Sequence, residues 1–73
     1  MFNYVQSKEE LGKNLRLKRE RRGWTQQEGA AKLYVDRSTY AYYETGKTEP
    51  SVGTLIQLSE IFGISVLEIL KSR

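Results

Sequence analysis

The polar side chains best suited to specific chemistry fall in a short segment, positions 37 to 44. Residues one turn apart lie above one another in a helix, so four positions of this segment share one face. They are Arg37, Ser38, Ala41 and Tyr42. Arginine can donate two hydrogen bonds to guanine O6 and N7, and serine can bond to base edges or phosphate. Tyrosine can pack on a thymine methyl or bond to phosphate, and alanine allows close approach. This face is predicted to read bases in a DNA major groove.

Further polar residues around this segment are suited to holding phosphates. Gln26 falls in the first turn of an expected helix, where backbone N–H groups and the helix dipole favour an anion. Lys47 follows the segment and could contact the same DNA backbone. The full set predicted to contact phosphates is Thr25, Gln26, Thr39, Thr45 and Lys47. Such contacts position a protein on DNA without reading its sequence.

The composition excludes most catalytic chemistry. The chain has no histidine and no cysteine, so it lacks the commonest general base, the commonest metal ligand and any disulfide. It also contains no nucleophile–base pair, metal cluster or phosphate-binding glycine loop. The sequence therefore predicts a protein that is not an enzyme and that uses no metal or other cofactor.

The apolar runs and the start of the chain bear on its location. No apolar run approaches the roughly 20 residues of a membrane span, and the first residues do not resemble a signal peptide. We expect no membrane association and a cytoplasmic protein, which the absence of cysteine also favours.

Start and stop signals divide the chain into five short helices. A Ser, Thr or Asp precedes each helix as the expected N-cap, and Glu10, Glu28 and Glu68 are expected to complete three capping boxes. Glycines at positions 23, 46 and 63 mark helix ends. The expected helices are 8–22, 26–33, 37–44, 52–62 and 66–71. This pattern predicts an all-α fold, a compact five-helix bundle forming a single domain over 1–73, with a helix-turn-helix core at about 25–45.

Apolar positions are expected to form one core beneath these helices. Leu11 and Leu15 recur at helical spacing, as do Tyr40 and Tyr43, which anchor the polar segment. The other expected core residues are Trp24, Ala30, Leu33, Val35, Val52, Leu55, Leu58, Phe62, Ile64, Val66, Ile69 and Leu70. Four apolar residues fall partly off these stripes and either pack at the edges or form a self-association surface with the last helix. They are Leu17, Ile56, Ile61 and Leu67.

Positive charge is concentrated in one stretch. The net charge is +3, and residues 8–22 hold seven basic residues against three acidic ones. Such a stretch is more often a solvated helix face than a phosphate-binding surface. We interpret Arg16, Lys18, Arg21 and Arg22 as mostly solvated, with one or two of them near distal phosphates.

The spacing of particular residues adds a more specific signal. It is carried by Thr25-Gln26, Ala30, Leu33, Val35, Arg37-Ser38-Thr39, Glu44, Gly46-Lys47 and Pro50-Ser51. With these residues the chain resembles the phage-repressor (Cro/repressor, XRE-type) helix-turn-helix family over about residues 11–70, nearly its whole length. The resemblance implies a five-helix domain of the lambda-repressor-like type. It further implies a transcriptional repressor that binds double-stranded operator DNA, usually as a two-fold homodimer.

The resemblance also implies roles for single residues. In that family the position of Gln26 holds a phosphate, and the positions of Arg37, Ser38 and Tyr42 meet bases. Arg19 and Glu44 resemble a family ion pair that ties the first helix to the third. Such a pair would set the angle of the reading helix, and removing one partner is expected to be harmful.

Two residues depart from the family pattern. Gly29 stands where a large aliphatic residue is usual, and Trp24 or Tyr40 is expected to fill the space. Tyr34 stands where the turn usually has glycine, so a left-handed backbone there would be strained by about 1–2 kcal/mol. Neither change touches the predicted DNA face.

A second function remains open from the sequence. Small domains of this kind also serve as protein-interaction modules, for example as the antitoxin of a toxin–antitoxin pair. That hypothesis predicts a partner-binding surface away from the helix at 37–44, such as the apolar C-terminal helix.

Overall fold

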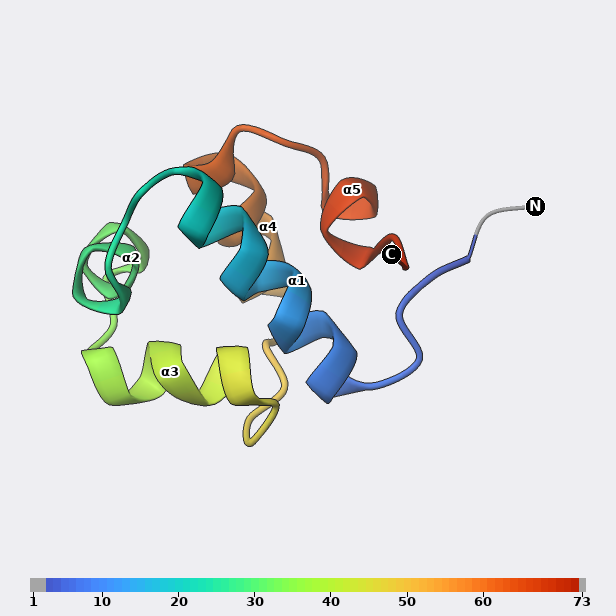
Figure 1. Ribbon diagram of the computed structural model, residues 1–73, viewed down its shortest axis with the longest axis horizontal. Coiled ribbons are helices and arrows are strands. Elements are labelled where there is room, and N and C mark those ends of the chain that lie inside the picture. Colours follow the sequence, from blue (N-terminus) through green and yellow to red (C-terminus); the bar gives the residue numbers. More distant parts are fainter. Residues whose placement is uncertain (1–2, 73) are drawn as a thin grey trace.

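Five α-helices make up the fold, whose computed structural model describes residues 3–72 (Figure 1). They are α1 (Lys8–Arg21), α2 (Gln26–Leu33), α3 (Arg37–Thr45), α4 (Val52–Phe62) and α5 (Val66–Leu70). Each helix begins at the predicted residue and ends within one residue of the prediction, so the all-α five-helix prediction is confirmed. Within residues 3–72 the only strand-like pairing is an isolated antiparallel bridge between Tyr4 and Lys71. None of the described helices is long and apolar enough to cross a membrane.

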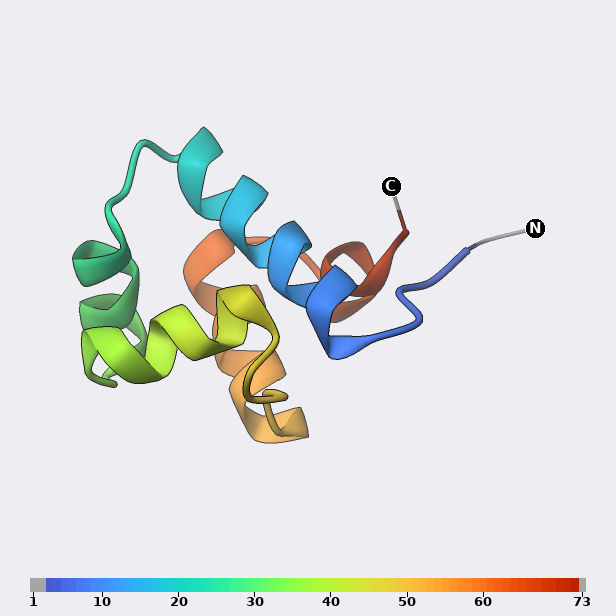
Figure 2. The same ribbon diagram turned by 60° about the horizontal axis from the view of Figure 1, so that its bottom comes forward.

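α1 crosses the middle of the molecule and packs against α3 and α5, while α2 packs against α3 and α4 (Figure 1). In that view α3 lies below α1, α2 lies at the left, and α5 lies at the right beside the N-terminal segment. When the lower side is turned forward, α3 comes to the front and no other helix covers it (Figure 2). One long side of α3 is therefore open to a partner.

Each helix begins at a side chain that accepts a hydrogen bond from a backbone N–H three residues later. These N-caps are Ser7, Thr25, Asp36, Ser51 and Ser65, as predicted. The capping box at Thr25 is complete, because the Glu28 carboxylate accepts from the Thr25 N–H at 2.8 Å. That backbone hydrogen bond lowers the pKa of the Glu28 carboxyl, so the cap of α2 is held by a charged acceptor.

The other two predicted capping boxes are wrong in their second half. Glu10 reaches one residue further back and accepts from the Gln6 N–H at 3.0 Å, while its other oxygen accepts from the Ser72 hydroxyl at 2.7 Å. The Glu68 carboxylate instead lies 3.8 Å from the Lys18 ammonium of α1. In both cases the carboxylate interacts with other groups instead of accepting from the backbone N–H of its N-cap residue.

The core follows the predicted stripes apart from one residue. The buried apolar residues are Leu11, Leu15, Ala30, Leu33, Tyr40, Tyr43, Leu58, Phe62 and Ile69. The prediction for Val52 is wrong: its side chain is 74% exposed, because the first turn of α4 extends beyond the packed part of the bundle (Figure 2). Of the four residues off the stripes, Leu17 and Ile61 are half-buried, whereas Ile56 and Leu67 are exposed.

Tyr40 fills the space that Gly29 leaves in α2. A methyl group added at Gly29 would lie 3.0 Å from Cζ of Tyr40, whose side chain is fully buried. Trp24, the other residue expected to fill this space, is half-buried and instead stacks on Phe62 at a ring-centroid distance of 5.6 Å. The small residue on α2 and the large one on α3 therefore compensate each other in volume.

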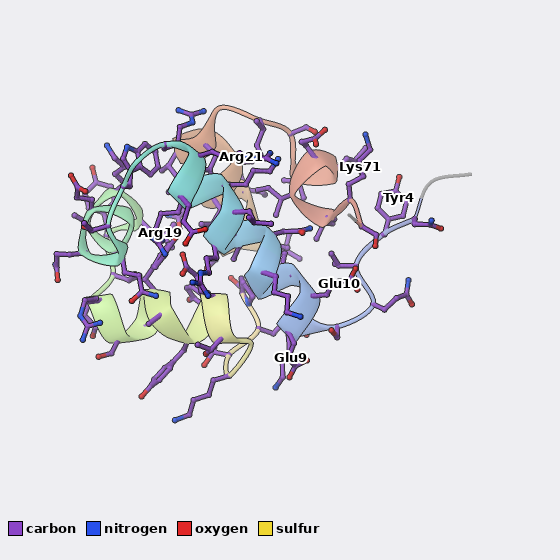
Figure 3. The ribbon with its side chains drawn as sticks, viewed as in Figure 1. Tyr4, Glu9, Glu10, Arg19, Arg21 and Lys71 are labelled. Atoms are coloured by element: carbon purple, nitrogen blue, oxygen red, sulfur yellow. The ribbon has the colours of Figure 1, made fainter. Side chains whose placement is uncertain are left out.

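The N-terminal segment, α1 and the end of α5 are joined by hydrogen bonds, and Tyr4 and Lys71 lie side by side (Figure 3). The Val5 N–H donates to the Leu70 carbonyl at 2.7 Å. The buried Asn14 amide of α1 donates to the carbonyls of Ile69 and Lys71 at 2.9 and 2.8 Å, which satisfies groups left open at the end of α5. No local sequence signal predicted this contact, because Asn14 is 55 and 57 residues from its partners.

α1 and α3 touch through their backbones, with a glycine at each end of the contact. A Cβ added to Gly12 would lie 2.6 Å from the carbonyl oxygen of Tyr43. A Cβ added to Gly46, which follows α3, would lie 2.7 Å from Cα of Glu9, and its φ of 81° also favours glycine. The distance between α1 and α3 is therefore set by main-chain contact rather than by interposed side chains.

We expect Gly12→Ala to destabilise the fold by about 1–3 kcal/mol, because the added methyl group meets carbonyls that cannot move aside. Gly53→Ala is the matched control. Gly53 is an exposed residue of α4 whose added Cβ would approach nothing closer than the Ser51 hydroxyl at 3.9 Å. Alanine there should stabilise the protein by about 0.5–1 kcal/mol. Urea unfolding of both variants measures the difference, and equal effects at the two sites would contradict the backbone contact.

Tyr34 occupies the turn between α2 and α3 in a left-handed conformation. Its φ and ψ are 63° and 37°, and among the described residues it is the only non-glycine with positive φ. Its side chain is 91% exposed, so little packing offsets the backbone strain. The condition under which the sequence predicted strain at Tyr34, a left-handed backbone, is therefore met.

Tyr34→Gly should raise the free energy of unfolding by about 1 kcal/mol, because glycine adopts this conformation without strain. Tyr34→Ala keeps a Cβ in the same conformation and should change stability little. Thermal or urea unfolding distinguishes the two variants. A gain in the alanine variant as large as that in the glycine variant would point to the tyrosine side chain rather than to the backbone.

Candidate nucleic-acid interface

The open side of α3 carries the residues predicted to read bases. Arg37 and Ser38 in its first turn are exposed, Tyr42 is 40% exposed, and Ala41 is half-buried beside them. The opposite face of the helix is buried and consists of Tyr40, Tyr43 and Glu44. The helix thus divides into an anchored face and a face available to a ligand.

The structure brings Arg19 of α1 and Glu44 of α3 together in a buried, two-pronged ion pair. Arg19 Nε donates to Glu44 Oε2 at 2.7 Å, and Nη2 donates to Oε1 at 3.1 Å. The hydrogen bonds to Glu44 raise the pKa of the Arg19 guanidinium above its usual value. The remaining Nη1 donates to the Trp24 carbonyl just before α2, at 2.8 Å. Figure 3 shows Arg19 in the space between α1 and α3, so one guanidinium links three helices.

The phenol of Tyr40 lies next to this pair. Its oxygen is buried and has no hydrogen bond of good geometry within the described chain. Burial raises the pKa of the Tyr40 hydroxyl far above its usual value, and the neighbouring Glu44 carboxylate adds to the rise. The hydroxyl therefore stays protonated, and the Arg19–Glu44 pair holds the charges of this region.

Gln26, predicted to hold a phosphate, is joined to the same cluster. Its side-chain Nε2 donates to Glu44 Oε1 at 3.1 Å, and the residue is half-buried. The amide group has a second N–H and an acceptor oxygen that remain for other partners. Sequence reasoning placed Gln26 at the start of α2 but missed its contact with α3, which joins the two helices of the helix-turn-helix.

The three threonines predicted to contact phosphate differ in what they already bind. The Thr25 hydroxyl accepts from the Glu28 N–H at 3.1 Å, which leaves its proton to donate. Thr39 is half-buried, and its N–H donates to the Asp36 carboxylate at 2.7 Å. This backbone hydrogen bond lowers the pKa of the Asp36 carboxyl. Thr45 is exposed, although its hydroxyl donates to the Tyr42 carbonyl within α3.

Lys47 lies in the exposed loop after α3, with its ammonium over the Tyr42 ring at 4.4 Å from the centroid. The Tyr42 carbonyl accepts from the Thr45 hydroxyl and from the Thr48 N–H, each at 3.3 Å. Sequence reasoning treated Tyr42 and Lys47 as separate DNA contacts. Their contact across a glycine turn has no local sequence signature.

Arg22 has a role that the basic stretch did not indicate. It donates a hydrogen bond to the Phe62 carbonyl at the end of α4, and its guanidinium lies 5.6 Å from the centroid of the Trp24 ring. Lys18 is likewise drawn into a contact with Glu68 of α5. Arg16 remains exposed and pairs with Glu20 at 3.2 Å on the surface of α1. Only part of the basic stretch is therefore a solvated face.

Comparison with known proteins places the chain in a family. The family model described as "Helix-turn-helix" matches residues 15–69. The chain is 42% identical over 61 residues to the SPbeta prophage-derived uncharacterized HTH-type transcriptional regulator YonR of Bacillus subtilis (strain 168), covering 84% of this chain and 56% of that protein. The chain belongs to the helix-turn-helix family, as its resemblance to the phage-repressor type indicated.

Solved structures support the same fold. The restriction-modification controller protein C.AhdI from Aeromonas hydrophila is similar with a TM-score of 0.82 and 25% identity, covering 86% of this chain and 96% of that one. The S. venezulae BldD DNA-binding domain is similar with a TM-score of 0.79 and 25% identity, covering 90% and 99% of the two chains. The chain spans about half the length of the curated relatives it matches, 43% to 56%.

Glu44→Gln should destabilise the fold by about 3 kcal/mol, because it leaves the buried Arg19 guanidinium without a compensating charge. Glu20→Gln is the matched control. It breaks the Arg16–Glu20 pair, whose side chains are 64% and 46% exposed, and should cost at most about 1 kcal/mol. Chemical denaturation of both variants provides the comparison. A small and similar loss in both would show that the buried pair does not hold α3.

Proposed function

We propose that the chain is a sequence-specific DNA-binding transcriptional regulator that acts as a repressor by inserting α3 into the major groove of an operator. The observation that carries this proposal is the division of α3 into a buried face and an open, polar face headed by Arg37. Membership of the helix-turn-helix family and the similarity to proteins named as transcriptional regulators support it. No catalytic activity is part of the proposal.

Base reading is assigned to the exposed residues of α3. Arg37 and Ser38 lie in the first turn, where a recognition helix meets base edges. The Arg37 guanidinium suits a two-pronged bond to guanine, and Ser38 suits several base edges. Ala41 lets the helix come close, and Tyr42, which is 40% exposed, lies one turn further along.

Positioning on the DNA backbone is assigned to residues around α3 and at the start of α2. Lys47 supplies a full positive charge, and the Gln26 amide has one N–H besides the one bound to Glu44. Thr25, Thr39 and Thr45 complete the proposed phosphate contacts. Because these groups do not recognise bases, they should contribute to affinity for any sequence, and the charge of Lys47 should make its contribution dependent on salt.

We further propose a homodimer on a two-fold operator. Two copies would place their α3 helices about 34–36 Å apart, the spacing of successive major grooves. Exposed apolar residues on α4 and α5 offer a surface for this contact: Val52, Ile56 and Leu67. A chain that acts on DNA in this way is expected in the cytoplasm.

The alternative, a protein-interaction module such as an antitoxin, is less well supported. The names of the relatives point to transcriptional regulation and not to a toxin partner. A protein partner would remain compatible with DNA binding, because the exposed apolar residues of α4 and α5 lie outside α3. Tight binding of such a partner without any DNA preference would favour the alternative.

Arg37→Ala should relax base preference at one operator position and weaken binding there by about 1–3 kcal/mol. The measurement is a selection from random duplex DNA with the purified protein, followed by affinities at fixed salt. Arg21→Ala is the control, since Arg21 lies on the side of α1 away from α3 (Figure 3).

Two outcomes of the selection would contradict parts of this proposal. Unchanged base preference in the Arg37 variant would show that Arg37 does not read a base. A selected site without two-fold symmetry would argue against the dimer, whereas the absence of any preferred sequence would remove the proposed function itself.

A further inference from the structure

The Lys47 ammonium is held by an aromatic ring and not by a carboxylate. Its nitrogen lies 4.4 Å from the centroid of the Tyr42 ring, and none of the ion pairs within residues 3–72 includes Lys47. A ring face attracts a cation through its electron density but does not neutralise it. The ammonium can therefore still bind an anion with its full charge.

The backbone that carries Lys47 is also tied to Tyr42. The Tyr42 carbonyl accepts from the Thr45 hydroxyl on one side of Gly46 and from the Thr48 N–H on the other. Gly46 turns the chain between them and packs against α1. The position of the ammonium is thus determined at both ends, by the loop backbone and by the ring.

We propose that Tyr42 is a positioning residue for Lys47, and that the two act as one unit on a DNA phosphate beside the bases that α3 reads. This inference rests on the proposed DNA-binding function. It changes the role expected for Tyr42, since the ring face that carries the ammonium is not free to stack on a base. The Tyr42 hydroxyl can still donate a hydrogen bond to DNA.

The physical advantage lies in the conformational entropy of lysine. A free lysine side chain samples many rotamers and loses that freedom when its ammonium binds a phosphate. Holding the ammonium over the ring beforehand reduces this loss, which is the effect of preorganisation on binding. The ring should therefore strengthen the phosphate contact without adding any base preference.

The first test uses the protein without DNA. In the wild type, the ring current should shift the NMR signals of the Lys47 ε-methylene protons upfield. Tyr42→Phe keeps a ring face and should retain the shift, whereas Tyr42→Leu should abolish it. Retention of the shift in Tyr42→Leu would overturn the proposed contact.

The second test is a double-mutant cycle on a selected DNA site at fixed salt. Lys47→Met should weaken binding to the preferred site and to its single-base variants alike, in the wild type and in Tyr42→Phe. In the Tyr42→Leu background, the loss of affinity caused by Lys47→Met should be about two- to fivefold smaller than in the wild type. That factor corresponds to roughly 0.5–1 kcal/mol, which is in the range of the entropy lost when one flexible side chain is immobilised at an interface.

Lys32→Met is the matched control for the second test. Lys32 of α2 also lies over an aromatic ring, at 4.6 Å from the Trp24 centroid, but that ring stacks on Phe62 and not on any residue of α3. Its loss should leave DNA affinity unchanged within twofold or so.

The outcomes separate this inference from the proposed function. If the wild type binds DNA and the effects of Tyr42→Leu and Lys47→Met simply multiply, the positioning role is overturned and the DNA-binding function stands. If the wild type binds no DNA, the proposed function is overturned, and so is the positioning role that rests on it. If the cycle shows coupling between Tyr42→Leu and Lys47→Met, and Lys47→Met keeps its full effect in Tyr42→Phe, the DNA-binding function and the positioning role are both supported.

Discussion

The ion pair between Arg19 and Glu44 lies where α1, α2 and α3 converge, and the angle of α3 depends on this pair. The guanidinium uses its Nε and Nη2 on the carboxylate and its Nη1 on the backbone before α2, while Gln26 adds a hydrogen bond from α2 to the same carboxylate. A buried pair of this kind contributes little net stability but strongly disfavours any arrangement that separates the charges. It therefore selects one relative placement of the three helices.

The turn between α2 and α3 contains backbone strain, which is compatible with that placement of the helices. Tyr34 holds a left-handed backbone without burial of its side chain, a strain that persists only where the surroundings determine the conformation. The surroundings here are the packing of Tyr40 against Gly29 and the ion pair at Glu44. Local strain in the turn is outweighed by contacts that neighbouring helices make on either side of it.

Sequence signals that act over a few residues predicted most of the fold. N-cap side chains located the start of every helix and glycines located the end of three of them, because capping is decided within one turn of the chain. Signals between distant residues were weaker. Asn14 at the end of α5, Gln26 beside Glu44 and Lys47 over Tyr42 all depend on which helices become neighbours. Val52 was misassigned for a related reason: periodicity places a residue on a helix face but does not tell where that helix extends beyond its neighbours.

The backbone contact at Gly12 has a consequence for how such a protein can diversify. Gly12 meets main-chain carbonyls of α3, and these are the same whatever side chains α3 carries. Exposed residues such as Arg37 and Ser38 can therefore be substituted without altering how α3 packs on α1. Under the proposed function, the scaffold and the base-reading residues are therefore separable, and new DNA specificities would need only a few surface substitutions on an unchanged architecture.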